Sequence, residues 1–162
     1  LRNDGQGRFV NVSDASGDWL LPKLSSRGAA FDDVDNDGEI DVVILNSRRE
    51  PTVLRNESAT GNHWLQVQLR GTRSNRDGIG ARVTVRAGDL TLIDEVHSGR
   101  SYQSDFGKRL HFGLGQRSAV DEVRVEWIGG GVDILRVEGV DRSITVVEGE
   151  GRQPTSTGSA AP

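Results

Sequence analysis

A strict alternation of apolar and polar residues is the feature that most constrains the fold of this chain. From 65 to 69, leucine or valine occupies every odd position, and glutamine occupies the positions between them. The same period of two recurs in 81–87 and 123–127. Side chains of a β-strand point alternately to opposite faces, so each stretch predicts a half-buried strand. Further strands are predicted at 90–96, 110–114, 132–137 and 144–147.

Turn-forming residues separate these predicted strands. Glycine accounts for 21 of the 162 residues, and it stands in the interruptions at 76–78, 87–89 and 129–131. Short strands joined by tight turns favour an all-β fold. Seven strands at this spacing predict an antiparallel β-sandwich or a partly closed barrel over residues 61–149. Residues 150–162 contain no valine, leucine, isoleucine or aromatic side chain, so we predict a flexible tail there.

Charge and composition argue against several classes of function. The formal net charge is −4, with acidic and basic residues interspersed, so we expect no nucleic-acid binding. No apolar run reaches the length of a membrane span, so we expect no membrane insertion. The absence of cysteine excludes disulfides, thiolate zinc sites and cysteine nucleophiles. The chain also lacks methionine, and we expect it to be a fragment or a processed product of a longer protein.

An acidic nonapeptide at 33–41, here called the acidic loop, predicts a calcium site. Aspartates occupy its positions one, three, five and nine, and Gly38 occupies position six. Alternate positions of a tight loop point inward, so the carboxylates converge while glycine permits the sharp backbone reversal. The predicted calcium ligands are Asp33, Asp35, Asp37, the main-chain carbonyl of Glu39, and Asp41.

Two other interpretations of the acidic loop fit its residues less well. An EF-hand needs a bidentate glutamate at position twelve and a helix on each side, but position twelve is Ile44 in a β-branched run. A solvated, metal-free turn would hold four like charges close together without a compensating cation. Calcium prefers six to eight oxygen ligands, whereas zinc and copper favour sulfur or nitrogen. The sequence therefore favours calcium.

The acidic loop and its flanks resemble an FG-GAP repeat, also called a VCBS-type repeat. The resemblance rests on RGAAFD at 27–32, the acidic loop, and VVILN at 42–46. The phrase Leu-Arg-Asn occurs at 1–3 and again at 54–56, an internal period of about 53 residues. Such repeats are blades of an integrin-like β-propeller, so the resemblance implies partial blades over residues 1–60. One complete calcium loop is present, too few for this chain alone to close a propeller.

Four later phrases resemble the ASPIC/UnbV domain of the cartilage acidic protein-like family. They occur in the order typical of that family and cover roughly residues 62–149. That family follows propeller blades in secreted proteins, and it implies no general catalytic activity. The phrases are NHWL at 62–65, SNRDGIGARV at 74–83, SGRSYQS at 98–104 and RLHFGLG at 109–115.

Together the two resemblances imply a calcium-binding, non-catalytic interaction or scaffold module that forms the C-terminal part of a larger propeller-containing protein. They imply a secreted, periplasmic or cell-surface location. The expected partners are upstream propeller blades of the same chain and a protein or glycan ligand. We expect residues 61–149 to fold without residues 1–60, and calcium to stabilise the blade alone.

An enzymatic alternative is the accessory or carboxylate-bearing part of a secreted carbohydrate-active hydrolase. Such enzymes use a pair of carboxylates, for which Asp94 and Glu95 with Asp105 are candidates. Nothing in the spacing of these residues shows that they converge. A metal or acid–base triad of histidines is a further option, but the histidines lack local ligand spacing, and we expect structural roles for them. These histidines are His63, His97 and His111.

Overall fold

The structure is a computed structural model that describes residues 1–15, 17, 23–100 and 102–152. Within these residues, regular structure is β except for a short 3-10 helix, η1 (Ser13–Ala15), which confirms the all-β prediction. No described helix is long and apolar enough to cross a membrane. The strands are β1 (Arg2–Asn3), β2 (Phe9–Val10), β3 (Ser26–Asp32), β4 (Asp41–Asn46), β5 (Thr52–Leu54), β6 (His63–Arg70), β7 (Arg82–Ala87), β8 (Leu90–Glu95), β9 (Leu110–Gly115), β10 (Val120–Glu126), β11 (Val132–Val137) and β12 (Arg142–Val147).

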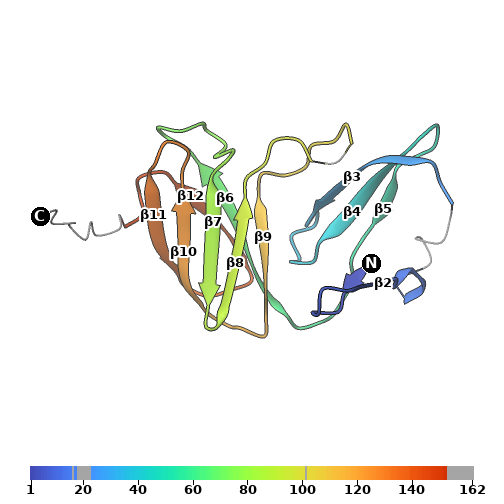
Figure 1. The fold of residues 1–162 in the computed structure, drawn as a ribbon, viewed down its shortest axis with the longest axis horizontal. Coiled ribbons are helices and arrows are strands. Elements are labelled where there is room, and N and C mark those ends of the chain that lie inside the picture. Colours follow the sequence, from blue (N-terminus) through green and yellow to red (C-terminus); the bar gives the residue numbers. More distant parts are fainter. Residues whose placement is uncertain (16, 18–22, 101, 153–162) are drawn as a thin grey trace, which may run out of the picture.

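Strands β6 to β12 form two sheets that pack as a β-sandwich (Figure 1). One sheet has the order β11-β10-β7-β8, and the other has the order β12-β6-β9. The apolar positions of the alternating pattern face inward, and Leu65, Val67 and Val83 are 0% exposed. We call residues 61–149 the β-domain. Its buried core consists of Leu65, Val67, Leu69, Ala81, Val83, Val85, Ala87, Val96, Leu110, Phe112, Leu114, Val120, Val123, Val125, Trp127 and Val146.

Strand β6 has one antiparallel and one parallel neighbour. It pairs antiparallel with β9 and parallel with β12, from Arg142 opposite Leu65 to Val147 opposite Arg70. The prediction of antiparallel pairing throughout is therefore wrong for β12. Alternation determines which face a residue occupies, but it carries no information about strand direction. No sheet formed by the described residues closes into a barrel, so the sandwich is the correct one of the two predicted alternatives.

Residues 1–60, here called the acidic region, form a separate set of strands (Figure 1). They contain the two-stranded β1-β2 hairpin and a three-stranded antiparallel sheet, β3-β4-β5. Residues that lie opposite one another across the three strands form a row, and the side chains of adjacent rows point to opposite faces of the sheet. Two adjacent rows of this sheet are apolar. Each face of the sheet therefore presents hydrocarbon. The two rows are Phe31-Val42-Leu54 and Ala30-Val43-Val53.

The acidic region buries almost no hydrocarbon of its own. Its buried described residues are Gly28, Asp33, Gly38 and Asp41, two glycines and two aspartates. Large apolar side chains remain exposed, and Val53 is 64% exposed. Burial in this region is therefore concentrated in and beside the acidic loop between β3 and β4.

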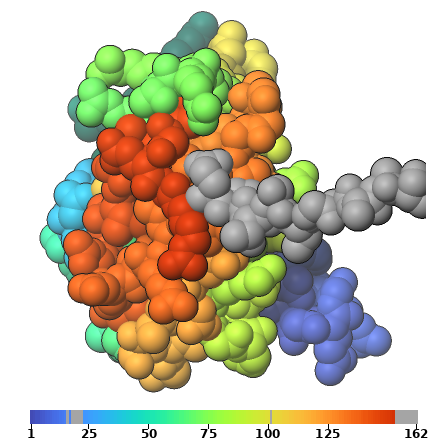
Figure 2. Space-filling model, turned by 90° about the vertical axis from the view of Figure 1, so that its left-hand side faces the viewer, coloured from blue at the N-terminus to red at the C-terminus, as the bar shows by residue number. Residues whose placement is uncertain are grey.

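The C-terminal segment remains paired beyond the end of β12. Arg152 exchanges two backbone hydrogen bonds with Ile134 of β11, and the Gly151 amide donates to Asp133 Oδ1. The predicted tail at 150–162 therefore starts too early, and residues 153–162 lie outside the described residues. Figure 2 looks onto this end of the molecule, where the loop after β6 (green) lies beside the C-terminal strands (orange to red).

Candidate metal centre

The first aspartate of the acidic loop organises the loop backbone. Asp33 is 1% exposed. Its Oδ1 accepts a hydrogen bond from the Asp37 amide at 3.0 Å, and its Oδ2 accepts one from the Gly38 amide at 2.9 Å. The loop is therefore wrapped around this carboxylate, because a short acidic side chain can bond to amides a few residues ahead.

Three of the predicted ligands come together. Carboxylate oxygens of Asp33, Asp35 and Asp37 lie within 4.8 Å of one another. The guanidinium of Arg55 lies 2.6 Å from Asp35 Oδ2 and 3.9 Å from Asp37 Oδ2. Carboxylates this close repel each other, and Arg55 supplies part of the compensating charge. Its side chain is 61% exposed, so little packing holds it in this position.

Asp41 and Glu39 have different surroundings. Asp41 is buried; its Oδ2 accepts from the Val34 amide at 3.0 Å, and its Oδ1 accepts from the Asn56 amide at 2.8 Å. It does not belong to the three-carboxylate group. The side chain of Glu39 accepts a hydrogen bond from Asn56 Nδ2 at 3.3 Å. Asp41 thus ties the loop to the segment after β5, and the ligand roles of Asp41 and of the Glu39 carbonyl remain predictions.

Gly38 is required at position six for two separate reasons. Its φ of +93° lies in the left-handed region, as the predicted backbone reversal demands. A Cβ atom at this position would also lie 1.9 Å from Nε1 of Trp64, far inside van der Waals contact. The second reason was not visible in the sequence, because it depends on a tryptophan of β6. The Trp64 ring in turn stacks on His111, with ring centroids 6.0 Å apart.

Two further side chains of the β-domain bind the acidic loop, and sequence reasoning missed both. Gln66 of β6 donates from Nε2 to Asp33 Oδ2 at 2.8 Å. Arg109 donates from Nη1 to Asn36 Oδ1 at 2.7 Å and from Nη2 to the Asp33 carbonyl at 2.6 Å. It also forms an ion pair with Asp32 at 2.8 Å. No local pattern signals these contacts, because they join segments more than 30 residues apart.

The available donor atoms suit a hard divalent cation. Calcium takes six to eight oxygen ligands at irregular angles, which three carboxylates, main-chain carbonyls and water supply together. Zinc and copper sites are built mainly from thiolates and imidazoles. The chain has no cysteine, and the potential ligand group contains no histidine. The residues present therefore fit calcium better than a transition metal.

The three histidines have different partners and form no metal-ligand group among the described residues. His63 Nδ1 lies 2.7 Å from Asp141 Oδ2, whereas His97 Nδ1 lies 4.0 Å from Glu95 Oε1. His111 lies in the sheet beneath the acidic loop, and burial lowers the pKa of its imidazole. This arrangement supplies no shared acid–base centre.

The carboxylates considered for a hydrolase are also engaged separately. Asp94 Oδ1 lies 3.5 Å from Arg100 Nη2, and Asp105 Oδ1 accepts a hydrogen bond from the Gly99 amide at 3.1 Å. A cavity of 180 Å³ beside Asp94 is lined by neither Asp105 nor Glu95. Asp94 therefore does not share this cavity with either of the other two carboxylates.

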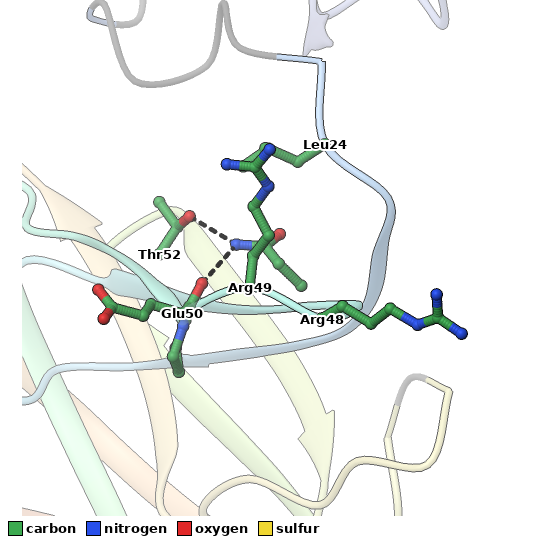
Figure 3. Close-up of a pocket in the computed structure, with 7 residues that line it drawn as sticks. Leu24, Arg48, Arg49, Glu50 and Thr52 are labelled. Carbon is green, nitrogen blue, oxygen red and sulfur yellow. Dashed lines mark hydrogen bonds between the residues drawn. The ribbon is translucent and has the colours of Figure 1, made fainter.

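A larger hollow of 620 Å³ lies at the turn between β4 and β5 (Figure 3). Its wall is fixed by Asn46, whose Nδ2 donates to the carbonyl of Glu50 and to Thr52 Oγ1, each at 2.9 Å. Arg48 and Arg49 border it, but Figure 3 shows their side chains pointing in different directions. The hollow therefore lacks the convergent charges that an anion site needs.

Comparison with known proteins places these features in a family context. The family model described as "ASPIC and UnbV" matches residues 71–153. Cartilage acidic protein 1 of Mus musculus and that of Homo sapiens are each 34% identical to this chain in an alignment of 121 residues that covers 70% of the chain. The alignment covers 18% of each relative, so the chain spans about a fifth of their length. The acidic loop lies outside the matched family region.

Proposed function

Because the chain belongs to the ASPIC and UnbV family, we propose that it is a calcium-binding, non-catalytic interaction module from a larger extracellular or cell-surface protein. The family match covers residues 71–153, whereas the proposed calcium site lies before that region. The proposed module therefore consists of a family domain and a separate metal-binding element that precedes it.

The observation that carries the calcium proposal is the convergence of three carboxylates around a loop built on Asp33. Oxygens of Asp33, Asp35 and Asp37 lie within 4.8 Å of one another. Calcium bound there would supply the positive charge that offsets their mutual repulsion. Glu39 through its carbonyl and Asp41 complete the proposed ligand set. The Arg55 guanidinium, 2.6 Å from Asp35 Oδ2 and 3.9 Å from Asp37 Oδ2, already marks this group of carboxylates as one that attracts positive charge.

The FG-GAP resemblance supports a proposed place for the acidic region in a propeller. A calcium loop between two strands of a small antiparallel sheet is what one such blade requires, and β3 and β4 flank the acidic loop in this way. Both faces of the β3-β4-β5 sheet carry partly exposed apolar side chains. Neighbouring blades would bury those faces. We therefore propose upstream blades of the same protein as partners, with a protein or glycan as the external ligand.

The proposed location is secreted, periplasmic or on the cell surface. It rests on the resemblance to domains that follow propeller blades in secreted proteins. A calcium site also suits such compartments, because the weak sites of extracellular modules fill only at about 0.1–1 mM calcium.

Titration calorimetry with calcium tests this function. The wild-type chain should bind one calcium ion, and Asp37→Ala should lose that binding because a converging carboxylate is removed. Glu57→Ala is the matched control, since Glu57 is an exposed carboxylate outside the acidic loop. At a hundredfold excess of calcium over Kd, the folded loop should gain about 2.7 kcal/mol of stability. Equal calcium binding by Asp37→Ala and the wild type would contradict the assignment.

A further inference from the structure

Gln66 is a buried polar side chain at the boundary between the β-domain and the acidic region. It belongs to β6, where the alternating pattern turns it away from the sandwich core. It is nevertheless 0% exposed, because the acidic loop covers it. Burying an amide is costly unless each of its polar atoms finds a partner. The hydrogen-bond partners of Gln66 therefore determine how its amide is oriented toward the acidic loop.

The two ends of the Gln66 amide have chemically distinct partners. Its Oε1 accepts a hydrogen bond from the hydroxyl of Ser143, and its Nε2 donates to Asp33 Oδ2 at 2.8 Å. The opposite orientation of the amide would place its carbonyl oxygen against the Asp33 carboxylate. Asp33 therefore selects the orientation in which Gln66 presents a donor to the acidic loop, and the Ser143 hydroxyl, which can donate or accept, supplies the donor to Oε1 in that orientation.

This donor determines which oxygen of Asp33 remains available. Asp33 Oδ2 already accepts from the Gly38 amide, so Gln66 gives it a second hydrogen bond and fills both lone pairs. Asp33 Oδ1 accepts one hydrogen bond, from the Asp37 amide, and keeps one lone pair. These hydrogen bonds thus fix the orientation of the Asp33 carboxylate, and Oδ1 is the oxygen that remains available to a cation.

The rest of the contact keeps the loop in place on the β-domain. Arg109 binds the loop at the Asp33 carbonyl and at Asn36 Oδ1, while the Trp64 ring lies against Gly38. These contacts come from β6 and from the segment before β9, not from the sheet that carries the loop. The geometry of the acidic loop therefore depends on a surface supplied by the β-domain.

We propose that Gln66 is a positioning residue for the calcium site, so that calcium binding and docking of the acidic loop on the β-domain are linked. This inference rests on the proposed function of the acidic loop. It assigns to the β-domain the role of completing a metal site whose carboxylates all come from the preceding region. Calcium would then fix how the propeller-like sheet and the β-domain are joined.

Gln66→Met in the full chain is the decisive variant. Methionine has a similar shape and is also uncharged, so the substitution removes the donor without changing the net charge near the cation. Loss of a side chain that orients a metal ligand typically costs about 10–100-fold in affinity, and we expect calcium to bind about tenfold more weakly. Gln68→Met is the matched control, because Gln68 lies two residues along the same strand face and is exposed. It should bind calcium like the wild type.

Two additional measurements separate positioning from general damage. Ser143→Ala keeps Gln66 but removes the hydroxyl bonded to its Oε1, which holds the amide in place, so calcium affinity should fall in the same direction by a smaller factor. Ser143 is exposed, and this variant stays informative if Gln66→Met does not fold. Amide hydrogen exchange at Gly38, whose N–H is bonded to Asp33, should accelerate in Gln66→Met and not in Gln68→Met.

The outcomes distinguish this inference from the proposed function. Asp37-dependent binding in the wild type, weakened by Gln66→Met and Ser143→Ala, supports both. Asp37-dependent binding that neither variant weakens overturns the positioning role and leaves the calcium site standing. A wild-type chain that binds no calcium rejects both.

Discussion

The β-domain and the acidic region bury different kinds of side chain. The β-domain encloses a core of aliphatic and aromatic residues between two sheets. In the acidic region, the buried side chains among the described residues are the carboxylates of Asp33 and Asp41. Hydrocarbon burial stabilises a fold without help from ions, whereas a buried carboxylate needs donors or a cation at every oxygen. The β-domain should therefore be stable without a bound ion, whereas the stability of the acidic region should depend on hydrogen-bond donors and on a cation.

The boundary between the two regions is polar. Gln66 and Arg109 of the β-domain reach the acidic loop, and the charge of Arg109 faces Asp32. The sequence suggested that calcium would act on the blade alone, but these contacts connect the loop to β6 and to the approach of β9. Hydrogen bonds of this kind fix geometry more than they add net stability. We therefore expect these contacts to fix the position of the acidic loop on the β-domain. We expect calcium binding at the loop to change the stability of the β-domain only slightly.

Truncating one apolar side chain in each region should give the largest difference in the free energy of unfolding. Leu65→Ala removes a side chain that is 0% exposed, and it should lower the free energy of unfolding by about 2–5 kcal/mol. Val53→Ala in the β3-β5 sheet, where the side chain is 64% exposed, should cost under about 1 kcal/mol. Urea denaturation of both variants measures the two losses. Equal losses would remove the distinction between a core-bearing and a coreless region.

The β-domain also contains a buried carboxylate, Glu148, which sharpens the comparison. Its Oε2 accepts hydrogen bonds from the amides of Thr72, Arg73 and Ser74 at 2.9, 2.7 and 2.8 Å. Glu148→Gln weakens this set of charge-assisted bonds and should cost about 1–3 kcal/mol, again by urea denaturation. Glu150→Gln, two residues further on and exposed, serves as the control and should change little.

The contribution of Glu148 to stability should also depend on pH. Burial by itself raises the pKa of Glu148, but the amide donors and the Ser74 hydroxyl outweigh it and lower this pKa from 4.5 to about 2. Because the folded pKa lies below the unfolded one, the stabilisation is complete above about pH 4.5 and is lost as pH falls toward 2. Over that window, the wild type should lose stability more steeply than Glu148→Gln. Parallel pH profiles would show that the amides do not stabilise the charged form.

An exposed ion pair of the β-domain should give the smallest effect. Arg117 Nη2 lies 2.8 Å from Asp89 Oδ1, and the Asp89 side chain is 85% exposed. Arg117→Ala should leave the free energy of unfolding almost unchanged, because solvent screens such pairs. The hydrogen bond and charge of Arg117 lower the pKa of Asp89, so NMR titration should show this pKa rising in the variant. A large loss of stability would mean that surface charge, and not burial, is what stabilises the β-domain.

The sequence predicted what depends on local pattern. Period-two alternation correctly identified the inward residues of β6 and β7, and the acidic spacing identified three carboxylates that converge. It missed the parallel pairing of β12 with β6, because alternation is the same for either strand direction. It also missed the role of Gln66, which the pattern placed on the polar face without showing what covers that face. Contacts between distant segments leave no periodic signal in the chain.

Amide hydrogen exchange of the full chain, with calcium and with a chelator, tests the contrast between the two regions most directly. It reads β4 of the acidic region and β7 of the β-domain in one experiment. Calcium should raise protection at residues 42–45, because it stabilises the loop that enters β4, and it should leave residues 83–85 unchanged. Unchanged protection in β4, or an equal loss of protection in both strands after chelation, would contradict a metal-dependent region joined to a metal-independent one.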